Sequence, residues 1–538
     1  MLNSTIATRG IAVAPHSLAA QSALDVMREG GNALEAMIAA AATIAVVYPH
    51  MNSIGGDGFW VISRPGFAPG GIDAAGKSAQ AASIDWYAKH GITGQIPFRG
   101  PMAALTVAGT VSGWGKAHEL SKSAGGRLPL SRLLADAIHY AESGIAVTPS
   151  QSQLTAKKLA ELKDQPGFAE TFLTHQASPK APKAPKAFTH LKQAALAKTL
   201  KTIAKEGTES FYRGKLARQI AADLQSLGSP ISLADLNTHQ AKLVDPLQLK
   251  LGSNTLLNMQ PPSQGLISLM ILGIMEKLKN WDDDPEGPAF IHAQVEATKQ
   301  AFKIRDAHLT DPAWMKSPAH TFLDDKLLTE LAAYINPHEA APWGSRTEPG
   351  DTIWMGVIDG SGLSVSFIQS IYHEFGSGIV LPQTGINWQN RGCAFSLDPN
   401  HINHLAPGKQ TFHTLNAAIA ELENNGTLVY GTMGGDGQPQ TQATLYQRVM
   451  QFGDHPQQAL SRPRWLLGRT WGQASESLKL ERRFSAATFE TLKAMGHDVE
   501  WLGDWDEAVG HAGMLMRDER GIMTGGFDPR SNGAVAGF

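Results

Sequence analysis

Cysteine is almost absent from this chain, in which Cys393 is the single example among 538 residues. An intramolecular disulfide needs two thiols and a cysteine-based zinc cluster needs more, so the sequence excludes both. A lone thiol can serve as a nucleophile, but it is more often a small buried apolar side chain. We therefore expect the reactive group of any enzyme activity to lie elsewhere.

Runs of one charge and long hydrophobic runs are also missing. The formal net charge is -3, and the 18% of charged residues are spread along the chain, which argues against a nucleic-acid or polybasic membrane surface. The most apolar run, residues 36–48, is shorter than the ~20 residues that span a bilayer, and no signal-peptide core begins the chain. These absences predict a cytoplasmic protein that binds neither nucleic acid nor a membrane.

The common catalytic and cofactor motifs are absent too. The chain has no P-loop, no G-x-S-x-G elbow and no H-E-x-x-H pair. The glycine-rich stretch at 53–60, "SIGGDGFW", precedes an apparent strand, so it indicates a tight turn rather than a dinucleotide site. His401 and His404 lie near Asp398 but have no further ligands in the sequence, which favours a polar loop. We predict no metal and no cofactor.

The two halves of the chain differ in their periodicity. Residues 17–47 predict two helices interrupted at Gly30-Gly31, with Asn32 as the N-cap of the second. From residue 352 onward, two strand-like runs flank a turn at 359–362, and apolar residues alternate in the second run. A helix-rich half followed by strands and helices predicts sheets covered by layers of helices.

Thr352 opens the first of these strands, directly after a predicted Pro349-Gly350-Asp351 turn. A threonine hydroxyl is a weak nucleophile without a base, and the α-amine of the same residue, with a pKa of about 7.7–8.0, can be that base. An internal threonine has no such amine until the Asp351–Thr352 peptide bond is cut, which its own hydroxyl can do by attacking the Asp351 carbonyl. Most threonines at strand starts only favour the strand, so this position alone leaves both interpretations open.

Eight segments along the chain bear on that choice. They are "GGNALEAMIAAAATIAVVYPHMNSIGGDGFW", "PPSQGL", "HAQVEATKQAFKIRDAHLTDP", "GDTIWMGVIDGSG", "FGSGIVLPQTGINWQNR", "YGTMGGDG", "RPRW" and "DPRSNGAVAGF". In sequence and in order they resemble the γ-glutamyltransferase family of N-terminal-nucleophile (Ntn) hydrolases. The resemblance extends from near the N-terminus to the last residue.

This resemblance implies an α+β fold, a four-layer αββα Ntn-hydrolase sandwich with an extended helical large-subunit region. It further implies a precursor that cleaves itself between Asp351 and Thr352. Residues 1–351 would form the large subunit and residues 352–538 the small subunit, entwined in one domain. The resulting partner arrangement is a heterodimer of cleaved subunits, which can pair further.

The resemblance also assigns catalytic roles. Thr352 would be the nucleophile and, through its amine, the general base. Ser370 falls where the family has a second threonine that orients the nucleophile, and it keeps the hydroxyl. Gly434 and Gly435 match the pair whose N–H groups form the oxyanion hole, and such donors stabilise a tetrahedral intermediate by about 3 kcal/mol each.

The residues that hold the glutamyl group in this family are not retained. The arginine that binds the α-carboxylate is replaced by Ala75, with Lys77 two residues further on. The aspartate that binds the α-amino group is replaced by Ala394. Losing a buried charged partner costs several kcal/mol of binding, because the opposite charge is left unpaired. Glutathione is therefore not the expected main substrate.

Other polar residues occupy the expected substrate pocket instead. Arg391 stands where the family has a neutral amide, and its planar fork suits a carboxylate. The remaining candidate substrate-binding residues are Tyr372, His373, Glu374, His413 and Thr414. The set predicts a small amide that carries a carboxylate, and the family includes enzymes that hydrolyse oxamate to oxalate and ammonia.

Two other functions and one structural role remain open from the sequence. The chain can be a divergent γ-glutamyltransferase or glutathione hydrolase that binds the glutamyl group elsewhere. It can also be a non-catalytic member of the family that stays uncut. Arg391 can be a structural arginine held in an ion pair, and Glu374 and His373 can likewise be structural.

Overall fold

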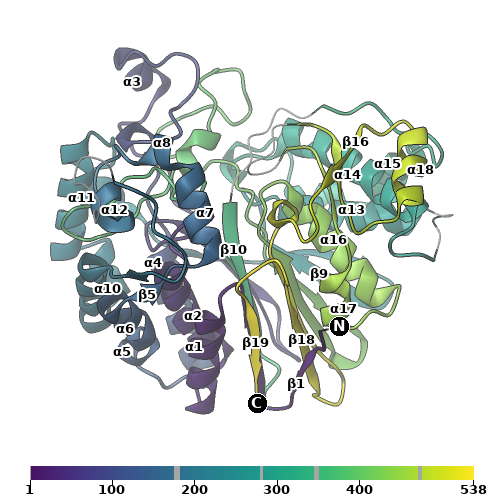
Figure 1. The fold of residues 1–538 in the computed structure, drawn as a ribbon, viewed down its shortest axis with the longest axis horizontal. Helices are drawn as coiled ribbons and strands as arrows, with labels where there is room; N and C mark the ends of the chain where they lie inside the picture. The colour runs from purple at the N-terminus through teal and green to yellow at the C-terminus, as the bar shows by residue number, and fades with distance from the viewer. Residues whose placement is uncertain (1, 175–181, 279–280, 282, 345–350, 470–474) are drawn as a thin grey trace.

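Two large antiparallel sheets form the centre of the protein (Figure 1). The computed structural model describes residues 2–174, 182–278, 281, 283–344, 351–469 and 475–538. Within these residues the first sheet has the order β1 (Thr5–Ala7), β18 (Met523–Phe527), β17 (Ala512–Arg517), β13 (Thr427–Thr432), β12 (Ala418–Glu421), β9 (Asn254–Asn258), β8 (Leu247–Leu251). The second has the order β19 (Ala534–Gly537), β2 (Gly10–Ala14), β10 (Asp351–Asp359), β11 (Ser364–Tyr372), β3 (Asp57–Ser63), β4 (Gly70–Ala74), β7 (Lys242–Val244).

Helices cover the outer face of each sheet, on the left and right of Figure 1. The second sheet is covered by helices that include α1 (Ser17–Arg28), α2 (Ala33–Val47), α4 (Thr110–Ser123), α6 (Ala135–Ser143), α10 (Ala194–Glu206) and α11 (Lys215–Leu227). The first sheet is covered by helices that include α13 (Gly265–Lys277), α14 (Pro288–His308), α15 (Asp325–Ala333), α16 (Gly437–Met450) and α17 (Pro456–Ser461). A smaller sheet comprises β14 (Trp465–Leu467), β15 (Leu478–Glu481) and β16 (Val499–Leu502), with α18 (Ala486–Ala494).

The hydrophobic residues divide into three main layers that match this arrangement. One cluster fills the space between α1, α2 and the second sheet, and another lies between the first sheet and α13, α14 and α16. A third cluster, which includes Trp354, Ile368 and Val429, lies between the two sheets. The α+β, four-layer αββα architecture is therefore confirmed. No described helix is long and apolar enough to cross a membrane.

The periodicities in the sequence predicted most local elements correctly. The expected helix pair is α1 and α2, and Asn32 caps α2 in a reciprocal capping box with Glu35. The two predicted strands are β10 and β11, and Val365 and Phe367 face the helical layer together. The predicted turn before Thr352 involves Pro349 and Gly350, which lie outside the described residues.

Both predicted subunit regions contribute strands to each sheet. In the second sheet, β10 lies between β2 and β11, and β11 lies between β10 and β3. The strands β2 and β3 precede residue 352, whereas β11 and all of β10 except Asp351 belong to the region that begins at Thr352. Neither region can form this sheet alone, which agrees with one entwined domain.

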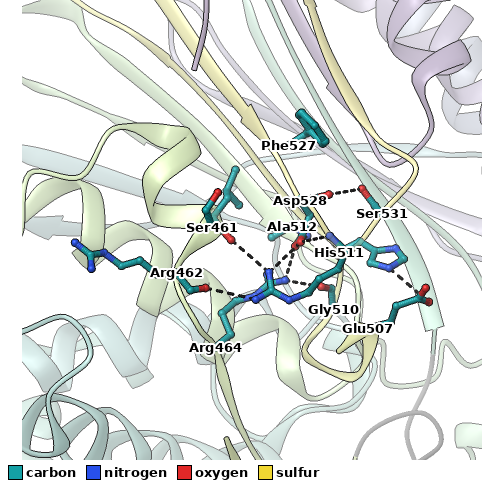
Figure 2. Close-up of polar contacts among 12 residues, drawn as sticks. Ser461, Arg462, Arg464, Glu507, Gly510, His511, Ala512, Phe527, Asp528 and Ser531 are labelled. Carbon is teal, nitrogen blue, oxygen red and sulfur yellow. Dashed lines mark hydrogen bonds and ion pairs between the residues drawn. The ribbon is translucent and has the colours of Figure 1, made fainter. Parts of the chain in front are cut away.

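A buried ion-pair network joins the segments "RPRW" and "DPRSNGAVAGF" (Figure 2). Asp528 accepts from Arg464, from Arg530 at 3.0 Å and from the backbone N–H of Ala512 at 2.7 Å. Arg464 also donates to the carbonyl of Gly510 at 2.7 Å. Burial acts to raise the pKa of Asp528, but the two arginine charges outweigh it and lower the pKa to about 2. The network fixes the 510–512 segment, which leads into β17.

An Asp528→Asn variant is expected to lose stability, because it removes the charge that two buried guanidinium groups require. Breaking a buried ion pair costs about 3–5 kcal/mol, so the melting temperature should fall by several degrees in scanning calorimetry. The matched control is Asp518→Asn, which removes an exposed pair with Arg520 and should have little effect. Equal melting temperatures for the two variants would contradict the structural role of this network.

Candidate active site

Three polar side chains line up across adjacent strands at one end of the space between the sheets. Ser370 on β11 is the direct antiparallel neighbour of Asp57 on β3. Directly opposed residues project to the same face with Cβ atoms about 5 Å apart. Thr352 lies at a register shift between Asp351 and Ile353 of β10, and such irregularities re-aim side chains next to active sites. The register of three strands thus places Thr352, Ser370 and Asp57 in one row.

The Thr352 hydroxyl is held by two side chains. Its Oγ1 donates to Ser370 Oγ at 3.3 Å, and Gln438 Nε2 on α16 approaches Oγ1 at 3.5 Å. Ser370 Oγ in turn accepts from the backbone N–H of Tyr372 at 2.8 Å. Thr352 is fully buried, and Asp351 precedes it within β10, so the structure represents the uncut chain. The hydroxyl is oriented, but its own amine is still part of a peptide bond.

Gly434 and Gly435 form the turn between β13 and α16. Their φ angles are +118° and +52°, and the value at Gly434 disfavours any residue other than glycine. Within the described residues, neither backbone N–H donates a hydrogen bond. Gln264 Nε2 fixes the turn by donating to the carbonyl of Gly435 at 2.9 Å. Two free donors at the start of a helix form an environment suited to an oxyanion.

Arg391 is fully buried beside this row. The N–H of Gln389 donates to Gly55 and that of Asn390 to Ile371, so the segment before Arg391 docks against the ends of β3 and β11. Its guanidinium carbon lies 4.0 Å from the centroid of the Tyr372 ring. None of its three guanidinium nitrogens has a hydrogen-bond partner in the described part of the chain.

Burial lowers the pKa of Arg391 to about 10, with the neighbouring Tyr372 and Asp57 acting in the opposite direction. The side chain therefore remains a cation at neutral pH. The alternative that Arg391 is held in a structural ion pair is wrong for the described residues, because its nitrogens are left without an acceptor. A buried, unpaired guanidinium is costly unless an anion joins it, so this arrangement suits a carboxylate ligand.

His413 and Thr414 approach the site from the other sheet, just before β12. His413 Nε2 lies 3.5 Å from Asp57 Oδ2, and both side chains are fully buried. Burial, with the charge of Arg391, holds the pKa of His413 well below its usual value, so the imidazole is neutral and the two do not form an ion pair. Gln264 Nε2 also donates to the Thr414 carbonyl at 2.8 Å, which ties this segment to the Gly434-Gly435 turn.

His373 and Glu374 follow Tyr372 but make different contacts. The His373 ring stacks on Phe98 with the centroids 5.0 Å apart, and it also contacts the Tyr372 ring. The Glu374 backbone carbonyl accepts from Arg99 at 2.7 Å. Their assignment as substrate-binding residues stays a prediction, whereas the structure brings Tyr372 directly against Arg391.

The positions expected for the glutamyl-binding residues carry no charged side chain near the row. Ala75 is buried and ends in a methyl group, and Lys77 is exposed to solvent. Ala394 contributes only its carbonyl, which accepts from Asn403. The predicted departure from glutamyl recognition therefore agrees with the placement of these residues.

His401 and a separate pair of buried histidines have protein partners. His401 Nδ1 accepts from the N–H of Asn403 at 3.0 Å, which is the arrangement of a polar loop. A separate buried group of His292, Glu296 and His497 has the residue types of a metal site. The two histidines bond each other at 2.8 Å, however, and Glu296 pairs with Lys299 at 2.6 Å.

The sequence interpretation missed Asp57, Gln264 and Gln438. Asp57 lies within the glycine-rich "SIGGDGFW" stretch, which was interpreted only as a turn. A single acid flanked by glycines and followed by buried strand residues was the available signal. Gln264 lies in the segment "PPSQGL" and Gln438 directly follows "YGTMGGDG", but their roles become visible only in the three-dimensional contacts.

Comparisons with known proteins identify the family of this chain. The family model of gamma-glutamyltranspeptidase matches residues 19–538. The chain belongs to the gamma-glutamyltranspeptidase family. It is 56% identical, over the full length of both chains, to the oxamate amidohydrolase proenzyme of Klebsiella pneumoniae. It is 39% identical, again over both full lengths, to the glutathione hydrolase-like YwrD proenzyme of Bacillus subtilis.

Solved structures of related proteins have the same fold. The structure is similar to cephalosporin acylase from Bacillus halodurans, with a TM-score of 0.91 and 32% sequence identity. That comparison covers 100% of this chain and 97% of the acylase. Related proteins of the gamma-glutamyltranspeptidase family are named as hydrolases, amidohydrolases and acylases. The chain shares their fold.

A Ser370→Ala variant is expected to slow both chain cleavage and substrate turnover by about 10–100-fold, because the Thr352 hydroxyl loses an orienting partner. Time-resolved gel analysis and ammonia release measure the two effects. The matched control is Ser366→Ala, which removes a hydroxyl from the same strand that bonds Trp354 at 2.9 Å. If the two variants were slowed to the same extent, Ser370 would have no specific role.

Proposed function

We propose that this protein is a self-processing amidohydrolase whose substrate is a small amide bearing a carboxylate, with oxamate as the favoured compound. The observation that carries the proposal is the buried guanidinium of Arg391, which has no partner among the described residues and lies beside the Thr352–Ser370–Asp57 row. The 56% identity to a protein named oxamate amidohydrolase proenzyme supports the choice of substrate.

Cleavage of the chain is the first step of this proposal. Thr352 Oγ1 attacks the carbonyl carbon of Asp351, and the peptide bond is replaced by an ester to the threonine oxygen. Water then hydrolyses the ester, which leaves a carboxylate on Asp351 and a free amine on Thr352. The product is a large subunit of residues 1–351 and a small subunit of residues 352–538. Separation of the two new ends would expose the buried hydroxyl.

Amide hydrolysis uses the new amine as the base. The amine takes the hydroxyl proton of Thr352 while Oγ1 attacks the amide carbon of the substrate. The N–H groups of Gly434 and Gly435 stabilise the oxyanion, and ammonia leaves with the transferred proton. Water then hydrolyses the acyl-enzyme ester and releases the acid, which is oxalate when the substrate is oxamate.

Recognition assigns the carboxylate of the substrate to Arg391. A bidentate pair there would satisfy nitrogens that are otherwise buried without partners. Tyr372 packs on the guanidinium face, and the buried His413 and Thr414 approach from the segment before β12 of the opposite sheet. In oxamate the carboxylate carbon is bonded directly to the amide carbon. Binding of the carboxylate at Arg391 therefore holds the amide carbon at a fixed distance from the guanidinium group.

A γ-glutamyl hydrolase or transferase is the second candidate, because a 39% identical relative is named as glutathione hydrolase-like. The side chains at Ala75 and Ala394 supply neither charge that a glutamyl group would need. A non-catalytic, uncut protein is disfavoured by the oriented hydroxyl of Thr352 and by the two free N–H groups of the glycine turn.

A Thr352→Ala variant is expected to stay a single chain of 57.6 kDa and to release no ammonia from oxamate. The hydroxyl that performs both the cleavage and the hydrolysis is missing. Intact-mass spectrometry of the purified wild-type protein should show two fragments that meet at Asp351–Thr352. A wild-type protein that remains uncut and inert would support the non-catalytic alternative.

An Arg391→Met variant is expected to cleave itself normally and to lose at least about 100-fold in kcat/KM for oxamate, since a buried carboxylate partner is removed. Arg391→Lys is the matched variant, because it keeps the charge without the planar fork and should retain intermediate activity. Ammonia release gives both values. Wild-type kcat/KM in the methionine variant would remove Arg391 from the substrate site.

A further inference from the structure

Asp57 has a position in the site that neither the proposed mechanism nor the sequence interpretation uses. It lies two strands from the nucleophile, opposite Ser370, and its side chain is fully buried. The unpaired guanidinium of Arg391 and the neutral imidazole of His413 lie close to it. The charge state of Asp57 must therefore affect how strongly a carboxylate binds at Arg391.

One half of the Asp57 carboxyl group is firmly fixed. Oδ1 accepts from the backbone N–H of Gly76 at 3.0 Å and from that of Gly109 at 3.1 Å. These two glycines pack so closely that a Cβ atom would lie 1.5 Å from the Val107 carbonyl oxygen or 1.7 Å from that of Ala74. The backbone around the carboxyl group is therefore shaped to hold it in one orientation.

The other half of the carboxyl group is left open. Asp57 Oδ2 has no hydrogen-bond partner among the described residues and faces His413 Nε2 at 3.5 Å. His413 Nε2 and Nδ1 also lack partners there. Buried polar atoms without partners are rare in folded proteins and indicate a function or a missing ligand. Here, unpaired atoms of an acid, an imidazole and a guanidinium lie on neighbouring buried side chains.

The charge on Asp57 is finely balanced. Burial raises its pKa to about 7, against the hydrogen bond from Gly76 and the positive charge of Arg391. Its other titratable neighbours are neutral, since burial lowers the pKa of His413 and raises that of Tyr212. The Gln389 amide also lies close to it. After chain cleavage the amine of Thr352 becomes a further titratable group in the same row.

A substrate carboxylate at Arg391 would disturb this balance. It places a second anion near Asp57 and shares the cation that favours the ionised form. Two carboxylates in one site cannot both ionise readily, so one of them takes up a proton. The carboxyl group of oxamate is a stronger acid than that of Asp57, because it lies next to a carbonyl group. The substrate therefore stays ionised, and Asp57 takes up a proton from the solvent. The protonated group then has a donor at Oδ2.

We propose that Asp57 is a specificity-determining residue that binds the substrate as a neutral carboxylic acid, donating from Oδ2 to the carboxylate that Arg391 holds. This inference rests on the proposed function and names how the same site selects its substrate. A neutral Asp57 gives no counter-charge to an ammonium group. The site therefore accepts a small dicarboxylic acid monoamide such as oxamate and rejects an amide that carries an α-ammonium group, such as L-glutamine.

The decisive variant is Asp57→Asn, because asparagine keeps the Oδ1 acceptor and carries a permanent donor in place of a protonated Oδ2. The ratio of kcat/KM for oxamate, variant over wild type, is measured by ammonia release from pH 6 to pH 8. The wild-type enzyme loses its binding form as pH rises through the Asp57 pKa, so the ratio should rise about tenfold, mainly through KM. The titration of the Thr352 amine is common to both proteins and cancels in the ratio.

The matched control is Asp73→Asn on the neighbouring strand β4. Burial raises the pKa of Asp73 as well, but this carboxylate bonds Ala75 and Gln410 instead of facing Arg391. Its ratio to wild type should not change with pH. A constant ratio for Asp57→Asn, or a folded and cleaved Asp57→Asn enzyme with no activity at pH 6, would overturn the proposal.

A second measurement separates this inference from the proposed function. Oxalate carries the carboxylate but no amide, so its binding does not depend on catalysis. In weakly buffered solution at pH 7, wild-type protein should take up about half a proton per site on binding oxalate, and Asp57→Asn none. No uptake, or no binding of oxalate, overturns the role of Asp57. Failure to hydrolyse oxamate with uptake intact would instead contradict only the proposed reaction.

Discussion

The register of β10, β11 and β3 is the constraint on which the site depends. It sets Ser370 opposite Asp57, and the irregularity at the start of β10 turns Thr352 toward Ser370. A shift of one residue in either pairing would turn a side chain of the row to the opposite face of the sheet. The segment that carries Arg391 docks against the end of this ladder.

The buried arginines of this protein differ in whether their charge is compensated by a carboxylate of the protein. Arg464 and Arg530 share Asp528, and Arg530 also pairs with Glu481, so their charges are compensated within the fold. Arg391 is equally buried, but its nitrogens have no partner in the described residues. This contrast with Arg464 and Arg530 makes Arg391 the candidate to bind an external anion.

The Arg464–Arg530–Asp528 network lies near the Gly434-Gly435 turn. Arg464 donates to the Gly510 carbonyl, and Met433 donates to the carbonyl of His511, directly before Gly434. The satisfied network thus holds the backbone against which the glycine turn rests. We infer that the compensated charges supply rigidity and that the uncompensated charge supplies binding.

Much of the fold was predictable from local patterns. Alternation in 363–369 and the Asn32 cap follow from periods and capping rules, and β11 and α2 are where those rules place them. Thr352, Ser370, Arg391 and the glycine pair were identified through the order of the family segments. Asp57 was not, because its contacts involve Gly76, Gly109, His413 and Arg391, which are distant in sequence and meet only when the strands interleave.

The most direct test of this account is the ratio of kcat/KM for oxamate to that for L-glutamine, measured by ammonia release with purified, cleaved wild-type protein. Recognition through Arg391, without a counter-charge for an α-ammonium group, predicts that oxamate is favoured by at least about 100-fold. A ratio below one would contradict the account. It would mean that the protein binds a glutamyl group despite Ala75 and Ala394.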